Sequence, residues 1–195
     1  MTKTAADVLA FWKDEVGVEK WYMGSPELDQ EIIDRFMSTY EAARDGKLDH
    51  WQGDANGSLA LLLLMDQFPR NMFRGDPRSF ATDPKARGVA RNAIEQGQDF
   101  EVDGLIRQFF YLPFEHSENL RDQEYGYAVF SKSMPDLSLG LLHARSHLEI
   151  IRKFGRFPFR NEVLGRESRA EETEFMENGG YMAFTDELEK REREA

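Results

Sequence analysis

The stretch SLALLLLMDQF, residues 58–68, is apolar almost all the way round a helical wheel. A helix without a polar face is buried, because it has no side that water can solvate favourably. We therefore expect a central buried helix over these residues. Pro69 follows directly and lacks the amide donor that a helix interior requires, so we expect it to end or kink this helix.

Helix boundary signals recur on both sides of this stretch, and the apolar period between them is near 3.6 residues. Ser25-Pro26 places a capping residue before a proline at the first helical position. Ser168 and Glu171 have the spacing of a capping box. Further helices are predicted around 9–12 and 32–43, and over 84–96, 103–112, 117–134, 137–154 and 170–178.

No run alternates as a strand does, so we predict an all-α protein of about seven to nine helices. The two longest helices, 117–134 and 137–154, are expected to pair as an antiparallel hairpin across Pro135. We predict a single domain over residues 1–185, followed by a charged, frayed helical tail over residues 186–195.

Composition excludes several classes of function. The chain has 25 Lys and Arg against 36 Asp and Glu, a net charge of −11. Such a chain repels phosphate, so neither nucleic acid nor an anionic membrane surface is an expected partner. It has no cysteine, which excludes disulfides and thiolate metal sites. With no long apolar run and no signal-peptide pattern, we expect a cytoplasmic protein.

Two separated segments read almost alike: DQFPRN at residues 66–71 and GRFPFRN at residues 155–161. Each ends an apolar helical run with Phe-Pro and then Arg and Asn. A guanidinium and an amide at a helix end form either a structural bracket or part of an anion-binding site. The candidate ligand-binding residues are Arg70, Asn71, Arg156, Arg160 and Asn161. An internal duplication would explain this likeness, and so would two helix corners that acquired the same residues independently.

Carboxylates and imidazoles gather in the second half of the chain. Glu115, His116 and Glu118 lie at an expected helix start, where they serve either proton transfer or helix capping. His143 and His147 are four residues apart on one helical face, a spacing that suits a metal but equally suits two structural histidines. Neither has the Glu-x-x-His context of a carboxylate-bridged centre. No metal and no cofactor is predicted.

Positive charge is concentrated in residues 139–169, which contain seven Lys and Arg but three Glu. Guanidinium groups at helix corners suit a carboxylate or phosphate ligand. The alternative is that the arginines pair internally with Asp66, Glu115, Glu118 and Asp122, which fixes geometry but adds little net stability.

Several motifs, in order along the chain, resemble the uncharacterised bacterial family catalogued as domain of unknown function 924. They are LALLLLMDQFPRNMFRG (59–75), FFYLPFEHSE (109–118), Asp122-Gln123, His147, and RKFGRFPFRNEVLGRES (152–168) with Glu171-Glu172. The resemblance implies a tetratricopeptide-like, right-handed array of antiparallel helix pairs and implies no activity. Phe159 stands where many members of that family have His.

Two hypotheses follow. In the first, the motif residues line one polar pocket that binds a small anionic molecule. In the catalytic form of this hypothesis the pocket also turns the molecule over, and His116 or His147 exchanges protons while Glu115 or Glu118 orients it. In the second, the protein is a helical scaffold that binds a protein or peptide, and the charged cluster is a structural ionic network. Whether the protein is an enzyme is left open.

Overall fold

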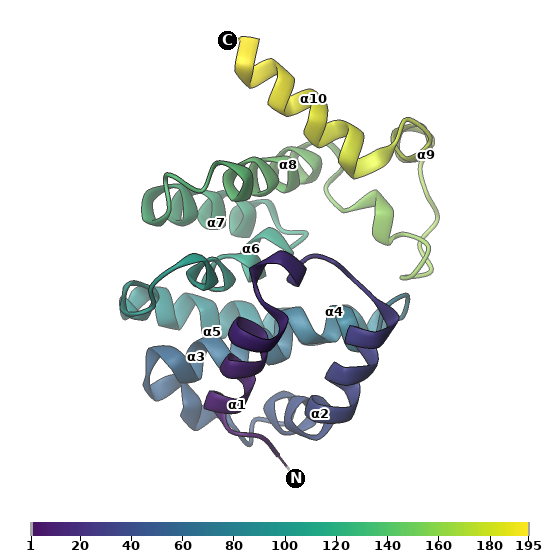
Figure 1. Cartoon of the computed structure of the whole chain (residues 1–195). Coiled ribbons are helices and arrows are strands. Elements are labelled where there is room, and N and C mark those ends of the chain that lie inside the picture. The colour runs from purple at the N-terminus through teal and green to yellow at the C-terminus, as the bar shows by residue number, and fades with distance from the viewer. Residues whose placement is uncertain (1, 195) are drawn as a thin grey trace. The chain divides into compact units, whose positions relative to one another are not determined.

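The computed structural model describes residues 2–194, and every regular element within them is a helix (Figure 1), which confirms the all-α prediction. Ten α-helices are described there, and three of these have six residues or fewer; the seven longer ones agree with the predicted number. The chain divides into two compact units, Met1–Pro113 and Phe114–Ala195. The expectation of a single domain over residues 1–185 stays a prediction, and each unit is described by itself.

The centre of the first unit is a continuous helical rod made of α3 (Ala55–Leu62), the π-helical segment η4 (Leu63–Gln67) and α4 (Phe68–Met72). Its apolar side chains are buried, as the sequence predicts. Pro69 does not end the rod. The carbonyl of Met65, which the missing amide of Pro69 leaves without its helical donor, accepts a hydrogen bond of 2.6 Å from the Thr82 hydroxyl.

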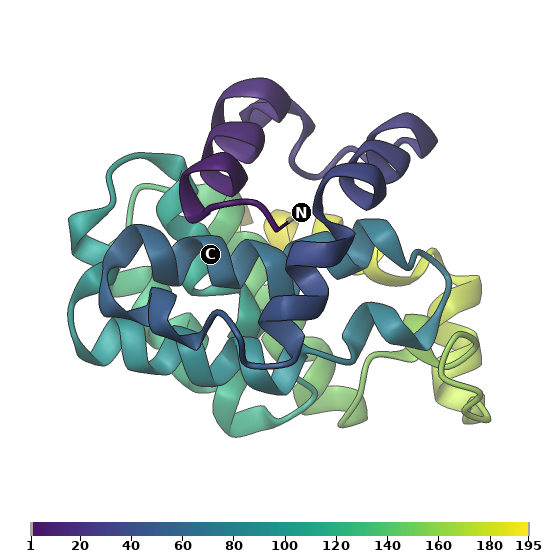
Figure 2. The ribbon, with the colours of Figure 1, turned by 90° about the horizontal axis from the view of Figure 1, so that it is seen from below.

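Helices surround this rod within the first unit. The N-terminal segment comprises α1 (Ala5–Ala10), the π-helical η1 (Phe11–Val16) and the 3-10 turn η2 (Val18–Lys20), followed by α2 (Pro26–Arg44). Figure 2 shows the purple α1 and α2 beside the blue rod; α1 packs on α3, and α2 packs on α4. Ser25 caps α2 by accepting from the Leu28 amide at 3.1 Å, as predicted. Phe11 of η1, Phe36 of α2 and Phe68 of α4 bring their rings into contact where these three elements meet.

The remaining elements of the first unit are the 3-10 turns η3 (Asp49–Gly53), η5 (Pro77–Phe80), η6 (Gln98–Glu101) and η7 (Leu105–Phe110), and the helix α5 (Asp83–Glu95). Helix α5 packs on α3 and η4. The helix predicted over 103–112 is thus a 3-10 segment, whereas the one predicted over 84–96 is present.

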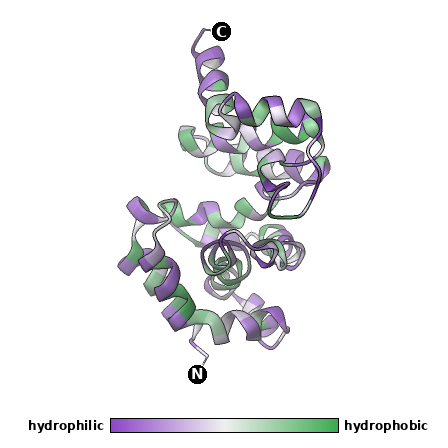
Figure 3. Cartoon of the chain, turned by 90° about the vertical axis from the view of Figure 1, so that its right-hand side faces the viewer, coloured by the Kyte–Doolittle hydropathy of each residue, from purple (hydrophilic) through white to green (hydrophobic). Residues whose placement is uncertain are grey.

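In the second unit, α7 (Leu120–Ser133) and α8 (Ser138–Phe154) form the predicted hairpin. The short α6 (Leu112–Glu115) spans the division between the units, and an irregular segment with the 3-10 turn η8 (Pro158–Arg160) leads to α9 (Ala170–Glu177). The final helix, α10 (Gly180–Glu194), begins before the predicted tail, so the predicted boundary at 185/186 falls inside it. Figure 3 shows that the last turns of α10 are hydrophilic.

Candidate functional site

The first Arg-Asn motif lies in an ionic cluster of the first unit. Arg70 contacts two buried carboxylates, Asp83 at 3.0 Å and Asp66 at 3.2 Å. Asn71 donates to Asp29 at 2.8 Å, and Asp29 in turn pairs with Arg74. Burial opposes the charge of Arg70, but the two carboxylates outweigh it and raise the pKa of the guanidinium. The motif therefore ties α4 to α5 and α2, and the predicted partnership of an arginine with Asp66 is present.

The second Arg-Asn motif lies in a network around Glu172 in the second unit. The Glu172 side chain is fully buried and accepts from Arg156 at 2.7 and 2.6 Å, and from Arg169 at 2.7 Å. Asn161 donates to it at 3.2 Å. The hydrogen bonds from Arg156 are the largest cause that holds the pKa of Glu172 far below its usual range. This network fastens the irregular segment 155–169 to α9.

The predicted capping box of Ser168 and Glu171 is wrong by one residue. Helix α9 begins after Arg169, whose backbone amide donates to Glu172 at 2.8 Å. The Ser168 hydroxyl instead accepts from Asn161 at 3.1 Å. The capping carboxylate is the same one that receives Arg156, so local capping and the long-range ion pair share Glu172.

Glu118 also holds the irregular segment. Its carboxylate pairs with Arg166 through contacts of 2.6 and 3.0 Å and accepts from the Phe157 amide at 2.8 Å. Burial would raise the pKa of Glu118, but the hydrogen bonds from Arg166 and Phe157 lower it. The carboxylate is thus ionised and engaged, and a part for it in proton exchange stays a prediction.

The other predicted site residues of the second unit are Glu115, His116, His147 and Arg160. Together with His143 and Tyr181 they form a group that we call the histidine cluster. His147 Nδ1 lies 3.7 Å from Glu115 Oε2, beyond hydrogen-bond distance, and it has no hydrogen-bond partner. Arg160 donates to the His116 carbonyl at 3.0 Å. Burial, with the nearby positive groups of His116 and Arg160, places the pKa of His147 well below its usual value. The His147 ring is therefore neutral at pH 7.

The histidine pair on α8 has structural contacts. His143 Nδ1 lies 2.7 Å from the Tyr181 hydroxyl, and the rings of His147 and Phe157 meet edge to face at 5.4 Å. Within residues 2–194, no three His, Asp or Glu side chains are placed to hold a metal ion together. These ring and hydroxyl contacts fit the interpretation of two structural histidines, and the choice between that interpretation and a metal site stays a prediction.

The nine predicted site residues thus fall into two groups. Arg70 and Asn71 belong to the first unit, with their partners there; the other seven belong to the second unit, in the Glu172 network, around Glu118 or in the histidine cluster. The expectation that all nine line one pocket stays a prediction.

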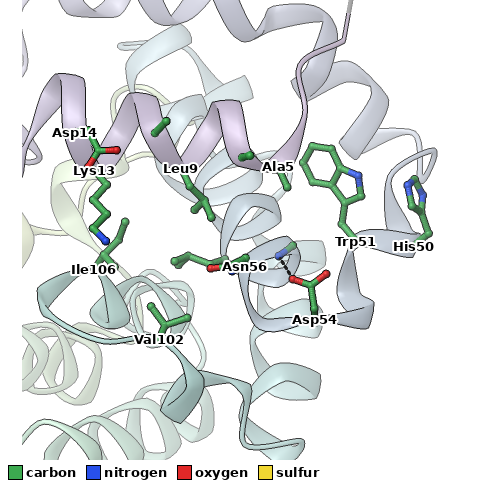
Figure 4. Close-up of a pocket in the computed structure, with 14 residues that line it drawn as sticks. Ala5, Leu9, Lys13, Asp14, His50, Trp51, Asp54, Asn56, Val102 and Ile106 are labelled. Carbon is green, nitrogen blue, oxygen red and sulfur yellow. Dashed lines mark hydrogen bonds between the residues drawn. The ribbon is translucent and has the colours of Figure 1, made fainter.

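A groove of about 730 Å³ lies elsewhere, on the first unit (Figure 4). Helix α1 forms one wall with Ala5, Leu9 and Ala10, and Leu59, Val102 and Ile106 lie opposite. Figure 4 shows Lys13 and Asp14 at one end of the groove, and Trp51 and His50 at the other. Its volume lies within the range typical of ligand pockets, roughly 300–1,000 Å³.

Sequence reasoning missed this groove. Its signal was weak: the continuous α1–η1 segment buries Val8, Phe11 and Trp12 on one face, yet Ala6 and Ala10 on another face are small, apolar and exposed. Trp51 reaches the groove because η3 runs directly over Gly57, near the start of α3.

None of the helices within residues 2–194 combines the length and the apolarity that crossing a bilayer requires.

The chain is similar to a protein of known structure but unknown function. A solved structure of a protein of unknown function from Agrobacterium tumefaciens is 44% identical, with a TM-score of 0.85, over 89% of this chain and 97% of that one. No curated protein matches the chain. Residues 8–180 match the family model described as bacterial protein of unknown function (DUF924). The chain therefore belongs to the DUF924 family.

Proposed function

We propose that this protein is a binding scaffold whose ionic clusters are structural and whose groove, on the first unit, binds a short peptide segment of a partner protein. The observation that carries the proposal is the groove between α1 and the residues Leu59, Val102 and Ile106. Its lining is mixed: Leu9, Val102 and Ile106 supply apolar surface, whereas Asn56 in the middle and Lys13 and Asp14 at one end supply polar groups (Figure 4). Such a lining suits a peptide that carries both apolar side chains and backbone hydrogen-bonding groups.

The dimensions of the groove support a peptide occupant. From Ala5 to Asp14 the helical wall rises about 14 Å at roughly 1.5 Å per residue. This length fits about four residues of extended chain at roughly 3.3 Å each. Trp51 at one end is half-buried and offers an aromatic surface of the kind that anchors binding interfaces.

The small anionic ligand of the first hypothesis has weaker support. Arg70 and Arg156, two of its expected binding groups, already contact buried carboxylates at 3.0 and 2.6 Å. An anion would have to displace Asp83 or Glu172 and leave that carboxylate buried without its cation, which is costly. The same geometry fits arginines that hold segments of the chain together. No reaction is assigned.

The test is a selection of random linear peptides against the purified protein, followed by measurement of their dissociation constants. The Ala10→Arg variant fills the groove from an exposed position of the α1 segment. We expect peptides selected on the unmodified chain to bind this variant at least about tenfold more weakly, a difference of roughly 1.4 kcal/mol.

The matched control is Ala81→Arg, which adds the same side chain at another exposed alanine of the first unit, outside the groove lining. It should bind the peptides as the unmodified chain does. Equal binding to Ala10→Arg, or a selection that yields no binder, would overturn the proposal. Thermal melting in phosphate, compared with chloride of equal ionic strength, tests the anion hypothesis in parallel.

A further inference from the structure

Helix α10 packs on the rest of the second unit through a narrow stripe of its surface. Tyr181 and Phe184 pack on an apolar cluster of α8, α9 and the segment between them, made of Ile150, Ile151, Phe154, Phe157 and Phe175. Thr185 and Leu188 are the other residues of α10 whose side chains are nearly buried. On its exposed face the helix carries ion pairs such as Glu187 with Arg191. A helix held by so few buried contacts is an element that opens locally.

Tyr181 joins this helix to the histidine cluster. Its hydroxyl lies 2.7 Å from His143 Nδ1, and the two rings are stacked. Its ring also meets that of His147, with centroids 4.9 Å apart. Burial and the neighbouring Glu115 raise the pKa of Tyr181, so the hydroxyl stays neutral. One side chain of α10 therefore contacts both imidazoles of α8.

We propose that Tyr181 is a latch that holds α10 over the histidine cluster, and that protonation of His143 and His147 releases this helix. The released state would expose the side chains of His147 and Glu115 to solvent.

Burial of the two histidines determines whether acid opens or closes α10. Desolvation lowers the pKa of His143, and desolvation is also the largest cause of the depressed pKa of His147. Once α10 has moved away, both rings regain water, and the pKa of each rises toward its usual value. At a pH near this value the two histidines therefore bind more protons in the open state than in the closed state. Opening is therefore favoured as the pH falls through the usual imidazole range, and the docked state is favoured at higher pH.

The charges that face the imidazoles act in both directions. Arg160 of η8 and His116, which follows α6, disfavour a proton on His147. Glu115 of α6 attracts one, at 3.7 Å from His147 Nδ1. Also on α8, Arg145, Glu149 and Lys153 line a cavity with Glu187 and Arg191 of α10, and these side chains carry charges of both signs. Burial is the largest of these effects on His147, which is why the latch opens in acid.

Hydrogen exchange of the backbone amides tests the latch on the full chain. Between about pH 7.5 and about pH 5.5, corrected for intrinsic exchange, the protection of α10 should fall by up to about tenfold per pH unit for each histidine. The protection of α2 should not change over the same range. Constant protection of α10, or a parallel loss across the whole second unit, would overturn the proposal.

Two variants and a control sharpen the test. Tyr181→Phe keeps the ring but removes the hydroxyl that meets His143, so α10 should exchange faster at every pH. The double variant His143→Gln with His147→Gln should remove the pH dependence. His50→Gln, at an exposed histidine of the first unit, should retain it. If the double variant does not fold, the exchange of the unmodified chain still decides the question.

Discussion

Gly57 of α3 lies so close to the carbonyl oxygen of Trp51 that a Cβ atom on this glycine would be 2.0 Å from that oxygen. The neighbouring Asp54 side chain caps the same turn by accepting from the Gly57 amide at 2.9 Å. The absence of a side chain at one position therefore brings η3 onto α3 and places Trp51 at the end of the groove (Figure 4).

Gly57→Ala should displace η3, because the obstructing atom belongs to the backbone and cannot rotate away. We expect a loss of about 1–3 kcal/mol in the free energy of unfolding, the usual range for overpacking. Denaturant unfolding measures it. The control is Gly53→Ala, at a glycine of η3 whose added Cβ would meet no atom within 4 Å. A Gly57→Ala variant as stable as this control would contradict the close contact.

Glu172→Gln should weaken the second unit, because Arg156 and Arg169 lose the charge of their shared, fully buried partner. The arginines are partly exposed, so we expect a loss of about 2 kcal/mol, less than for a wholly buried pair. Glu171→Gln is the matched control, since that carboxylate is exposed and its contact with Arg169 is 3.5 Å long. It should cost no more than about 0.5 kcal/mol. Equal losses for the two variants would exclude the structural role of Glu172.

The contribution of Glu172 to stability should also depend on pH. Interactions in the folded state lower the pKa of Glu172 and of Glu118, so each stabilises the fold above its unfolded pKa of about 4.5. That stability is lost as the pH falls below this value and the unfolded chain binds protons first. In urea titrations from about pH 5 to about pH 3, Glu172→Gln should show a shallower decline than the unmodified chain. Identical slopes would mean that Glu172 titrates normally.

Local patterns predicted much of the helical structure correctly. The Ser25-Pro26 signal marks the start of α2, and the apolar period with Pro135 marks the α7–α8 hairpin. These features depend on residues a few positions apart, so they are legible in the sequence. Pro69 shows the limit of such reasoning: the rod continues through it because Thr82, thirteen residues later, supplies the missing donor.

The likeness of the two Arg-Asn motifs, and the choice between bracket and anion site, were visible in the sequence before any fold was known. Which carboxylate each arginine meets was a matter for the tertiary structure: Asp83 for Arg70 and Glu172 for Arg156. The groove likewise depends on α1 lying near Val102 and Ile106, which are far from it in the chain. Helix formation follows from the period and caps of a single segment, whereas ion pairs and cavities depend on how distant segments pack, which no local pattern encodes.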